Sequence, residues 1–565
     1  MFQGYDEIFH RTLFLYPGQI LLHYGDILRL SGMNFSKNTS IPSLVTLSLC
    51  YLALPYVFFF LGYLRWYAAC PCLLCLLAGL YAHRTISGTP PSEKVSTGSV
   101  DISWLCLLLV LCAAFFLLLF SGVGGYGYQD EDWFKHNAIF KALIEHPWPV
   151  SYSLASSGAG GSEGVAQIPL VYYVAYYVPA AVVGKLFGWF WANQALFLWT
   201  YLGVCLSLLW FIVLARHAAM MTVFIFCLFS GLDALGLFLV RFFFLGQSVP
   251  LSQWWHIERW SGNWQYPAHA ASVFWVPNQA VAAWIATALI LYTLLHSSAK
   301  SHLLLYVSLT PLWSPFVTLG LLPYIIVDFL REKKPLVQKM KNYFSIGNVC
   351  GTVMLFVVGM FYLSRMYALP VSRVPSASGF IFNHPIVTGL LWYETLGFLW
   401  LFLLLEFGVY VIIIFFSGVP LSDREKCVLL VSTVVLTLLP FFRYGFWNDL
   451  VMRASAPALF VMSIFVVKVL YTTAARRGIV IVLALALLIG TANSGIEYRR
   501  HLVKTMKRGH IFVLPEARSL HDAPNTKVNP SFFFQYIGSA DAPFFRYMAK
   551  SLQAHGEILT PADLE

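Results

Sequence analysis

Residues 121–150 read SGVGGYGYQDEDWFKHNAIFKALIEHPWPV, and they follow directly on the apolar run 103–120. A run of that length and character predicts a membrane helix. The consecutive carboxylates Asp130, Glu131 and Asp132 are therefore expected just outside the bilayer, where lipid meets water. No other part of the first half of the chain is as dense in acidic residues.

The composition of the whole chain places it in the membrane class. Its 565 residues are 59% hydrophobic and only 11% charged, and the mean hydropathy is +0.70, values typical of a multi-pass membrane protein. The net charge of +10 is spread over short loops and does not form the clustered basic patch that is typical of a nucleic-acid-binding protein. The ten cysteines fall mostly in apolar runs, and we interpret them as small hydrophobic residues rather than as a disulfide framework or a zinc site.

Many apolar runs reach, or come close to, the roughly 20 residues that a spanning helix needs. The run 302–330 contains Pro311, Pro315 and Pro323, and proline breaks a helix interior, so we predict two half-length helices that form a hairpin there. The sequence thus predicts an all-α integral membrane protein with about thirteen membrane segments. The other runs are 42–62, 66–82, 103–121, 193–215, 218–244, 272–297, 345–363, 387–416, 427–442, 455–472 and 478–494.

The distribution of lysine and arginine sets the expected orientation. With a cytoplasmic N-terminus, most cation-rich loops fall inside and the acidic loop falls outside. The number of predicted crossings places the tail outside. This conflicts with the rule that cations lie inside, because the tail opens with Arg499, Arg500, Lys504, Lys507 and Arg508. The expected segments are an amphipathic lead-in 1–41, three helices within 42–121, a long outer loop 122–192, a helix bundle 193–494 with outer loops 246–271, 364–386 and 443–454, and a short tail 495–565.

The long outer loop is expected to have two parts. A helix should begin near Asp132 and stop at His146, because four residues share one stripe at helical spacing: Asp132, His136, Ile139 and Leu143. A Gly/Ser-rich link at 158–164 follows. The tyrosine-rich segment 167–189 then predicts a helix that lies in the membrane interface.

The three acids allow two interpretations. Acidic residues at a helix N-terminus accept its free N–H groups and oppose its dipole, which explains one or two of them. Three acids stand at the exit of a membrane helix and are followed within one turn by Lys135 and His136. This favours a functional role, because ionisable groups at a membrane are energetically costly and are commonly kept for function.

This arrangement resembles the pattern of GT-C fold glycosyltransferases, whose loop often reads Asp-Glu, then a helix, then Pro-Pro-Leu-x-Tyr. Here the later element is QIPLVY at 167–172, with Ile168 in place of the first proline, and three predicted helices rather than one precede the loop. The resemblance covers about residues 103–330. It implies an enzyme that moves a sugar from a polyprenyl-phosphate donor to a glycan, lipid or protein acceptor.

A second resemblance concerns the cell envelope. The sequence segments DWFKHNAIF, HPWPV and WNDLVMRAS are similar to those of a group of uncharacterised bacterial multi-pass membrane proteins with this layout. It implies a bacterial inner membrane, with the site facing outward, and supplies no substrate.

Inverting glycosyl transfer needs a carboxylate that takes a proton from the acceptor hydroxyl and cations that face the leaving phosphate. Asp132 is the first candidate for the base, because it opens the helix and can share His136 one turn on. Asp130 is the second candidate, with Glu131 between them. Lys135 could meet a phosphate or be a solvated partner of the acids.

The distal outer loops are expected to supply substrate contacts. Arg443 and Arg453 bracket Asn448, and arginine suits a bidentate grip on phosphate, although arginines here could also reach to lipid headgroups. Aromatic faces stack on sugars, but tryptophan belts occur at any membrane interface. The candidates in the Trp-rich loop are Trp255, His256 and Glu258.

Metal use and two rival functions stay open at this stage. Some relatives of the GT-C fold use a divalent ion, and Asp130 and Asp132 could hold Mg²⁺ or Mn²⁺, but no ligand spacing demands it and no metal ligand is assigned. A flippase or transporter of a lipid-linked saccharide would place polar residues deep within several helices and repeat its broken helices in two halves. A glycan polymerase or ligase would use the same loops with a larger acceptor.

Overall fold

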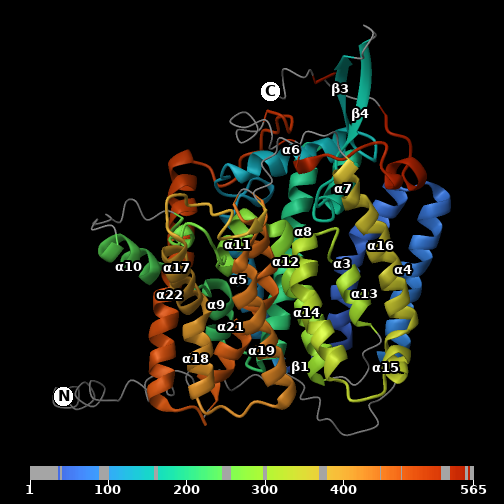
Figure 1. Cartoon of the computed structure of the whole chain (residues 1–565). Coiled ribbons are helices and arrows are strands. Elements are labelled where there is room, and N and C mark those ends of the chain that lie inside the picture. The colour runs from blue at the N-terminus through green and yellow to red at the C-terminus, as the bar shows by residue number, and fades with distance from the viewer. Residues whose placement is uncertain are drawn as a thin grey trace, which may run out of the picture.

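The computed structural model describes most of the chain as helix, with a few short strands (Figure 1). Residues 1–35 of the expected lead-in lie outside the described part, as does Trp255. The described residues are 36–38, 41–87, 101–157, 163–244, 256–296, 302–367, 378–445, 447–472, 474–522, 533, 535–553 and 558–559.

Seven helices are long and apolar enough to cross a membrane, or eight if one bent pair counts as a single span. The chain is therefore an α-helical membrane protein. The bent pair is α9 (Met220–Leu228) and α10 (Asp233–Leu239), which meet at 42°. The seven are α3 (Ile41–Tyr63), α4 (Trp66–Ser87), α8 (Trp189–Ala215), α12 (Pro277–His296), α16 (Ile346–Leu363), α17 (Trp392–Leu403) continued by η6 (Leu404–Gly408) and α18 (Val409–Phe416), and α22 (Arg477–Arg508).

The other predicted spans contain shorter helices. α5 (Trp104–Leu119) and α21 (Ala456–Tyr471) have 16 residues each, and α19 (Asp423–Leu438) opens on four charged residues. Within the described ranges seven or eight spans thus meet the length criterion, and the thirteen segments stay a prediction. α21 is packed among other helices, whereas α5 leaves Trp104, Leu108 and Phe116 exposed.

α13 (Leu303–Ser308) and α14 (Pro315–Arg331) go into the bundle and return to the same side. The turn between them reaches α3, where the Leu312 amide donates to the Tyr56 hydroxyl at 3.1 Å. At the far end of α14, Arg331 donates to the carbonyl of Asp423 at 3.3 Å. Pro315 opens α14, whereas Pro323 lies inside it without ending it.

One end of the bundle carries the folded loops (Figure 1). We call it the loop face; it holds residues 120–157, 163–188, 256–276, 378–391, 439–445, 447–455, 509–522, 533, 535–553 and 558–559. A ribbon of strands stands on it, in which β3 pairs antiparallel with β4 and parallel with β7. Its elements are α6 (Asp132–Glu145), β3 (Ser151–Ser157), β4 (Glu163–Pro169), α7 (Val178–Phe187), η4 (Ile257–Arg259), α11 (His269–Trp275), β5 (Gly379–Phe380), β6 (Phe442–Arg443), α20 (Asp449–Ala454), η9 (Phe544–Met548) and β7 (Ile558–Leu559).

The prediction of one interfacial helix over 167–189 is wrong. Its first residues belong to β4, because Gln167 hydrogen-bonds across the ribbon to the hydroxyls of Ser151 and Ser153. The tyrosines that follow are buried in the core rather than spread in the interface, and the helix begins only at Val178. By contrast, α6 runs from Asp132 to Glu145 as predicted.

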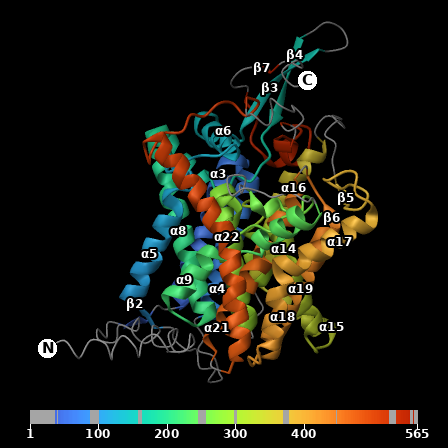
Figure 2. The same ribbon diagram turned by 90° about the vertical axis from the view of Figure 1, so that its left-hand side faces the viewer.

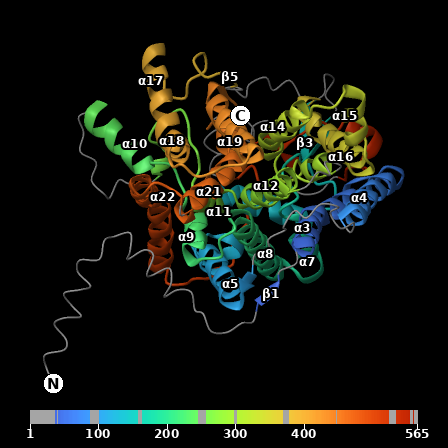
Figure 3. The ribbon, with the colours of Figure 1, turned by 90° about the horizontal axis from the view of Figure 1, so that it is seen from below.

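Seen from below, α10, α17 and α18 lie at one side of the bundle, and α4, α15 (Leu336–Tyr343) and α16 lie at the other (Figure 3). The central helices α8 and α12 are the most buried spans. Alanines at 280, 282, 283, 286 and 288 line α12, and such small side chains let neighbouring backbones approach closely within a membrane.

The C-terminal part returns to the loop face. α22 has 32 residues and is therefore about 48 Å long, which exceeds the ~30 Å hydrocarbon core of a bilayer; Figure 2 shows it running the height of the molecule. The tail then pairs with the acidic loop, where the Val513 amide donates to the Gly125 carbonyl at 3.1 Å. Further on, the Lys550 amide donates to the Tyr63 carbonyl at 2.8 Å.

Candidate functional site

α6 presents its three acids in different surroundings. Glu131 is at the N-cap, but its side chain makes no capping bond and is exposed. Asp132 is the first helical residue and its side chain is 24% exposed. Asp130 precedes the helix and its side chain is only 7% exposed. Capping by Glu131 therefore does not explain the cluster.

Asp130 joins the acidic loop to the end of α22. Its Oδ2 atom lies 2.6 Å from Nη2 of Arg500 and 2.7 Å from Nε2 of His501, and its Oδ1 atom lies 3.6 Å from Nζ of Lys504. Lys504 follows Arg500 by four residues and His501 by three, so all three side chains lie on one side of the helix. Glu497, on the same face, lies 3.0 Å from Arg500.

The charge of this cluster keeps Asp130 ionised. Burial alone would raise its pKa, but the hydrogen bond from His501 and the charges of His501, Arg500 and Lys504 outweigh that effect and hold the pKa below its ordinary value. Because each oxygen of Asp130 already faces a cation, this carboxylate is suited to holding α22 in place.

His256 stands next to the same cluster. Its Nδ1 atom is 4.0 Å from Oε1 of Glu497, and its ring stacks on Trp275 at 4.3 Å. Burial, and then the charges of Arg500 and Arg259, lower the pKa of His256 to about 4. The imidazole is therefore neutral at pH 7.

Asp132 faces a second group of cations. Its Oδ2 atom is 3.0 Å from Nζ of Lys135, and the charge of Arg453 from α20 also acts on it. Arg453 uses Nε and Nη2 to bind Oδ1 of Asp449, at 2.9 and 2.5 Å. Its Nη1 atom is buried and has no hydrogen-bond partner among the described residues, so one edge of the guanidinium is left for a further acceptor.

The pKa of Asp132 lies below its ordinary value. Burial acts to raise it, but Lys135 first, and then His136 and Arg453, outweigh that effect. His136 itself is enclosed in the core, where Nδ1 contacts the Tyr177 hydroxyl and Nε2 lies 3.2 Å from the Trp275 carbonyl. Burial lowers the pKa of His136 to about 3, and both nitrogens are engaged by the protein.

Aromatic rings line the space around these charges. The Arg259 guanidinium lies 3.8 Å from the centre of the Trp447 ring, and that of Arg500 lies 4.9 Å from the Trp275 ring. Lys504 lies 4.2 Å from the Tyr128 ring. Flat aromatic faces next to cations are suited to binding a sugar that carries a phosphate.

Two of the predicted clamp residues have other contacts. Arg443 donates from Nη1 to the carbonyls of His384 and Pro385, at 3.0 and 2.9 Å. Asn448 is 1% exposed, and its Nδ2 atom donates to the Asn263 carbonyl at 3.4 Å. Both residues hold the turn 443–448 to neighbouring loops rather than facing Asp132.

Glu258 belongs to a buried polar cluster behind the site. It accepts hydrogen bonds from the Ala268 amide and from Nδ2 of Asn493, each at 2.9 Å. The same Asn493 nitrogen donates to Asp233 at 2.9 Å, and nearby Glu406 accepts from Trp260 at 2.8 Å. Burial and the charge of Asp233 raise the pKa of Glu258 to about 8, so its carboxyl is mostly protonated at pH 7.

The structure brings together Asp130, Asp132, Lys135, His256 and Arg453 from three separate loops. The partners on α22 were not predicted as site residues: Glu497, Arg500, His501 and Lys504. A signal for them was present, because the cations that open the tail did not fit the expected orientation. Arg500 and Lys504 lie on the loop face, where they pair with Asp130.

The acids do not fit a divalent metal. Each faces cations, with Arg500 and Lys504 beside Asp130 and Lys135 beside Asp132, and a metal ion there would be repelled. Within the described ranges, no group of three His, Cys, Asp or Glu side chains is arranged to hold a metal ion.

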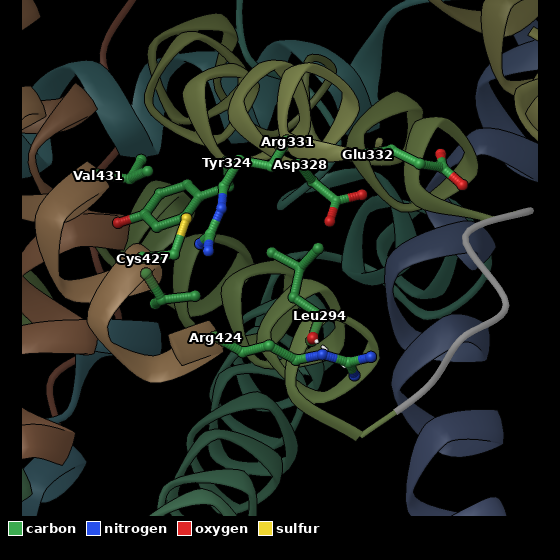
Figure 4. A pocket seen from close by; sticks show the side chains of 9 residues that line it. Leu294, Tyr324, Asp328, Arg331, Glu332, Arg424, Cys427 and Val431 are labelled. Carbon is green, nitrogen blue, oxygen red and sulfur yellow. Dashed lines mark hydrogen bonds between the residues drawn. The ribbon is translucent and has the colours of Figure 1, made fainter. Parts of the chain in front are cut away.

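A pocket of about 180 Å³ lies on the opposite face, between α14 and α19 (Figure 4). Arg331 and Arg424 line it together with Asp328 and Glu332, so its charges balance. It contains none of the predicted site residues and is separate from the acids of the loop face.

Comparisons with family models, with curated proteins and with solved structures give no match to this chain. The function is therefore argued from the site itself.

Proposed function

We propose that this chain is a membrane glycosyltransferase with a GT-C-like layout of about thirteen membrane segments. It would move a sugar from a polyprenyl-phosphate donor to a glycan, lipid or protein acceptor at the outer face of a bacterial inner membrane. The observation that carries the proposal is Asp132, a part-exposed carboxylate facing Lys135 and the buried, incompletely bonded guanidinium of Arg453.

In the proposed reaction, Asp132 takes the proton of the acceptor hydroxyl as that oxygen attacks the anomeric carbon. The bond from that carbon to the donor phosphate breaks, and the phosphate leaves with the electron pair. Attack from the face opposite the leaving group inverts the anomeric centre. Lys135 and Nη1 of Arg453 stabilise the charge that develops on the phosphate.

The low pKa of Asp132 is compatible with this role only if Lys135 changes partner. While Lys135 lies 3.0 Å from the carboxylate, Asp132 is ionised but weakly basic. A bound phosphate competes for the ammonium group, and its negative charge also raises the proton affinity of Asp132. Donor binding would therefore activate the base.

The test is transfer of labelled sugar by the purified protein from a panel of polyprenyl-phosphate sugars. Asp132→Asn is expected to abolish transfer while donor binding persists. Asp130→Asn, matched for folding, is expected to retain part of the activity, because Asp130 acts through α22. Full transfer by Asp132→Asn would reject Asp132 as the base, and no transfer from any donor would reject the glycosyltransferase.

A flippase or transporter of a lipid-linked saccharide is the second candidate, and one observation favours it. Asp233, Glu406 and Asn493 are buried within three different helical segments, as expected for an ion or proton path. Movement of a labelled lipid-linked sugar across proteoliposomes, lost in Glu406→Gln, would favour this function. A glycan polymerase or ligase would show itself in the first assay by products longer than one added sugar.

A further inference from the structure

The pocket between α14 and α19 has a volume of about 180 Å³ and changes in character along its length (Figure 4). Its inner part is apolar, because Tyr324, Val428 and Val431 line it and are 2%, 5% and 5% exposed. Its four charged lining residues stand at the mouth, where α14 ends and α19 begins. The pocket therefore joins an apolar interior to a charged opening.

Hydrogen bonds join the two helices at both ends of the pocket. Toward the bundle, the Tyr324 hydroxyl lies 2.7 Å from the Ser432 hydroxyl. At the mouth, Nη1 of Arg331 donates to the Asp423 carbonyl at 3.3 Å. The lining residues fall at the spacing i, i+4, i+7 on α14 and i, i+3, i+4, i+7 on α19, so each helix turns one stripe toward the pocket. The pocket is therefore built into the packing of the two helices.

The two acids of the mouth are held by neighbouring side chains. Oδ2 of Asp328 accepts a hydrogen bond from the Tyr343 hydroxyl of α15 at 2.8 Å. Oε1 of Glu332 lies 3.1 Å from Nζ of Lys334. An ionised carboxylate has about four lone-pair sites, so each acid can accept further hydrogen bonds from a cation in the pocket.

The two arginines of the mouth extend from the facing helices (Figure 4), and their contacts with backbone carbonyls are long. Nη1 of Arg424 lies 3.4 Å from the carbonyls of Leu294 and Leu295, and the bond of Arg331 to Asp423 measures 3.3 Å. An ordinary N–H···O bond measures about 2.7–3.2 Å. The guanidinium fork matches a carboxylate, so a ligand with that group offers both arginines a stronger acceptor.

Charge and size together select a class of ligand. The mouth carries two positive and two negative side chains, so a singly charged molecule is attracted by one pair and repelled by the other, whereas a zwitterion meets an opposite charge at each end. A cavity of ~150 Å³ holds benzene, so this interior takes a ring or a branched chain of about that size. It is too small for the two acyl chains of a phospholipid.

We propose that this pocket binds a free α-amino acid with an apolar side chain. The carboxylate of the ligand binds Arg331 and Arg424, and its ammonium group donates to Asp328 and Glu332. Its side chain packs in the apolar interior. The site lies on the face opposite the acids of α6, and it does not rest on the function proposed above.

The test measures binding of labelled L-phenylalanine to the full chain in detergent. Three competitors each lack one feature: 3-phenylpropionate has no ammonium group, phenethylamine has no carboxylate, and glycine has no apolar side chain. We expect each loss to weaken binding about tenfold or more. The absence of saturable L-phenylalanine binding would overturn the proposal, and so would equal affinity for any of the three competitors.

Variants on α19 test the lining against matched controls. Arg424→Gln is expected to weaken L-phenylalanine binding about tenfold, whereas Lys426→Gln, which removes an exposed cation outside the lining, leaves it unchanged. Val431→Phe fills the interior without altering charge and should weaken binding as well, whereas Val434→Phe, at a position that is 44% exposed, should not. Thermal unfolding shows which variants are folded. Because Arg424 is exposed, its variant decides the test if Val431→Phe is unstable, and unchanged affinity in Arg424→Gln would overturn the proposal.

A phosphatidylethanolamine headgroup carries the same two charges as an amino acid. The binding assay is therefore repeated in nanodiscs that contain phosphatidylethanolamine and in nanodiscs of phosphatidylglycerol alone. We expect equal affinity for L-phenylalanine in both. Loss of binding in the nanodiscs with phosphatidylethanolamine would make the membrane lipid the occupant and overturn the amino acid.

Discussion

At the scale of single residues, Asp130 and Asp132 are two positions apart and have different surroundings. Asp130 is enclosed by Arg500, His501 and Lys504, so its charge is used to fix α22. Asp132 keeps a part-exposed carboxylate beside a single lysine. Their difference is a property of the folded chain, because both are aspartates within one loop of the sequence.

The ion pair of Asp130 predicts a loss of stability in Asp130→Asn. Arg500 and His501 are 12% and 0% exposed, and removing one member of a buried ion pair costs about 3–5 kcal/mol. Thermal unfolding in detergent micelles should show this loss. Asp132→Asn, the same substitution at a part-exposed residue, should lose about 1 kcal/mol or less. Equal unfolding temperatures of Asp130→Asn and the unmodified protein would contradict the role given to this pair.

The same residue predicts how stability depends on pH. The pKa of Asp130 is lower in the folded protein than in the unfolded chain, so the folded state binds fewer protons. The stabilisation is complete above the unfolded pKa, near 4, and is lost as the pH falls through the folded value. Unfolding temperatures measured from pH 6 downward should therefore fall less in Asp130→Asn than in the unmodified protein.

For Asp132 the prediction concerns activity. Lys135 lowers the pKa of Asp132, so the acid limb of kcat/KM against pH should lie below the ordinary aspartate pKa. Lys135→Gln should move that limb to higher pH and also reduce the rate. Lys141→Gln, on the same helix, should leave the limb in place. An acid limb that does not move in Lys135→Gln would exclude Asp132 as the titrating base.

At the scale of elements, the re-entrant pair α13 and α14 depends on a close approach to α16. A Cβ atom on Gly351 would lie 2.7 Å from the backbone carbonyl of Leu304 and from the amide of Leu305, whereas one on Gly359 of the same helix would meet nothing within 4 Å. Glycine at 351 thus lets the two helix backbones touch.

Gly351→Val is accordingly expected to destabilise the protein by about 1–3 kcal/mol, the usual cost of overpacking. Gly359→Val makes the same change on the open side of α16. Its free energy of unfolding should stay close to that of the unmodified protein, because the new Cβ atom meets nothing within 4 Å. Unfolding in detergent compares the two. A similar loss in both variants would show that valine in α16, and not the contact with α13, is responsible.

The elements also show what could be predicted from the sequence. α6 was predicted from end to end, because its stripe and the His-Pro sequence at its end are local signals. The ribbon of β3 and β4 was missed, because strand pairing joins residues on both sides of a glycine-rich link and has no marker in either strand alone. The runs 103–121 and 455–472 predicted α5 and α21 to within two residues at each end.

At the scale of the whole molecule, the acidic loop and the C-terminal tail share one face, and α15 with Lys341 and the start of α19 with Lys426 lie on the other. A cysteine replacing Glu131 or Arg518, both exposed, should react with a membrane-impermeant thiol reagent from the same side. Cysteines replacing Lys341 or Lys426, also exposed, should react only from the opposite side. The background is a variant without the ten native cysteines, all of which are free thiols.

Labelling of positions 131 and 518 from different sides would contradict the arrangement. The sequence contained this information in part. The tail was expected beside the acidic loop, but its cations conflicted with that orientation, and only the pairing of Asp130 with α22 explains them. Long-range charge pairing of this kind leaves no pattern within either segment. The acids of the site could therefore be predicted from the sequence, whereas their partners on α22 could not.

The bridge between Asp130 and Arg500 spans 370 positions of the chain. During synthesis the acid therefore leaves the ribosome long before its partner exists, and among the described residues α8, α12, α16 and the span from α17 to α18 must be made in between. Throughout that interval the first loop carries an uncompensated charge cluster at the lipid surface, which must stay hydrated or be shielded. The contacts around Asp130 can form only when the last helix arrives, so the loop face is completed at the end of synthesis.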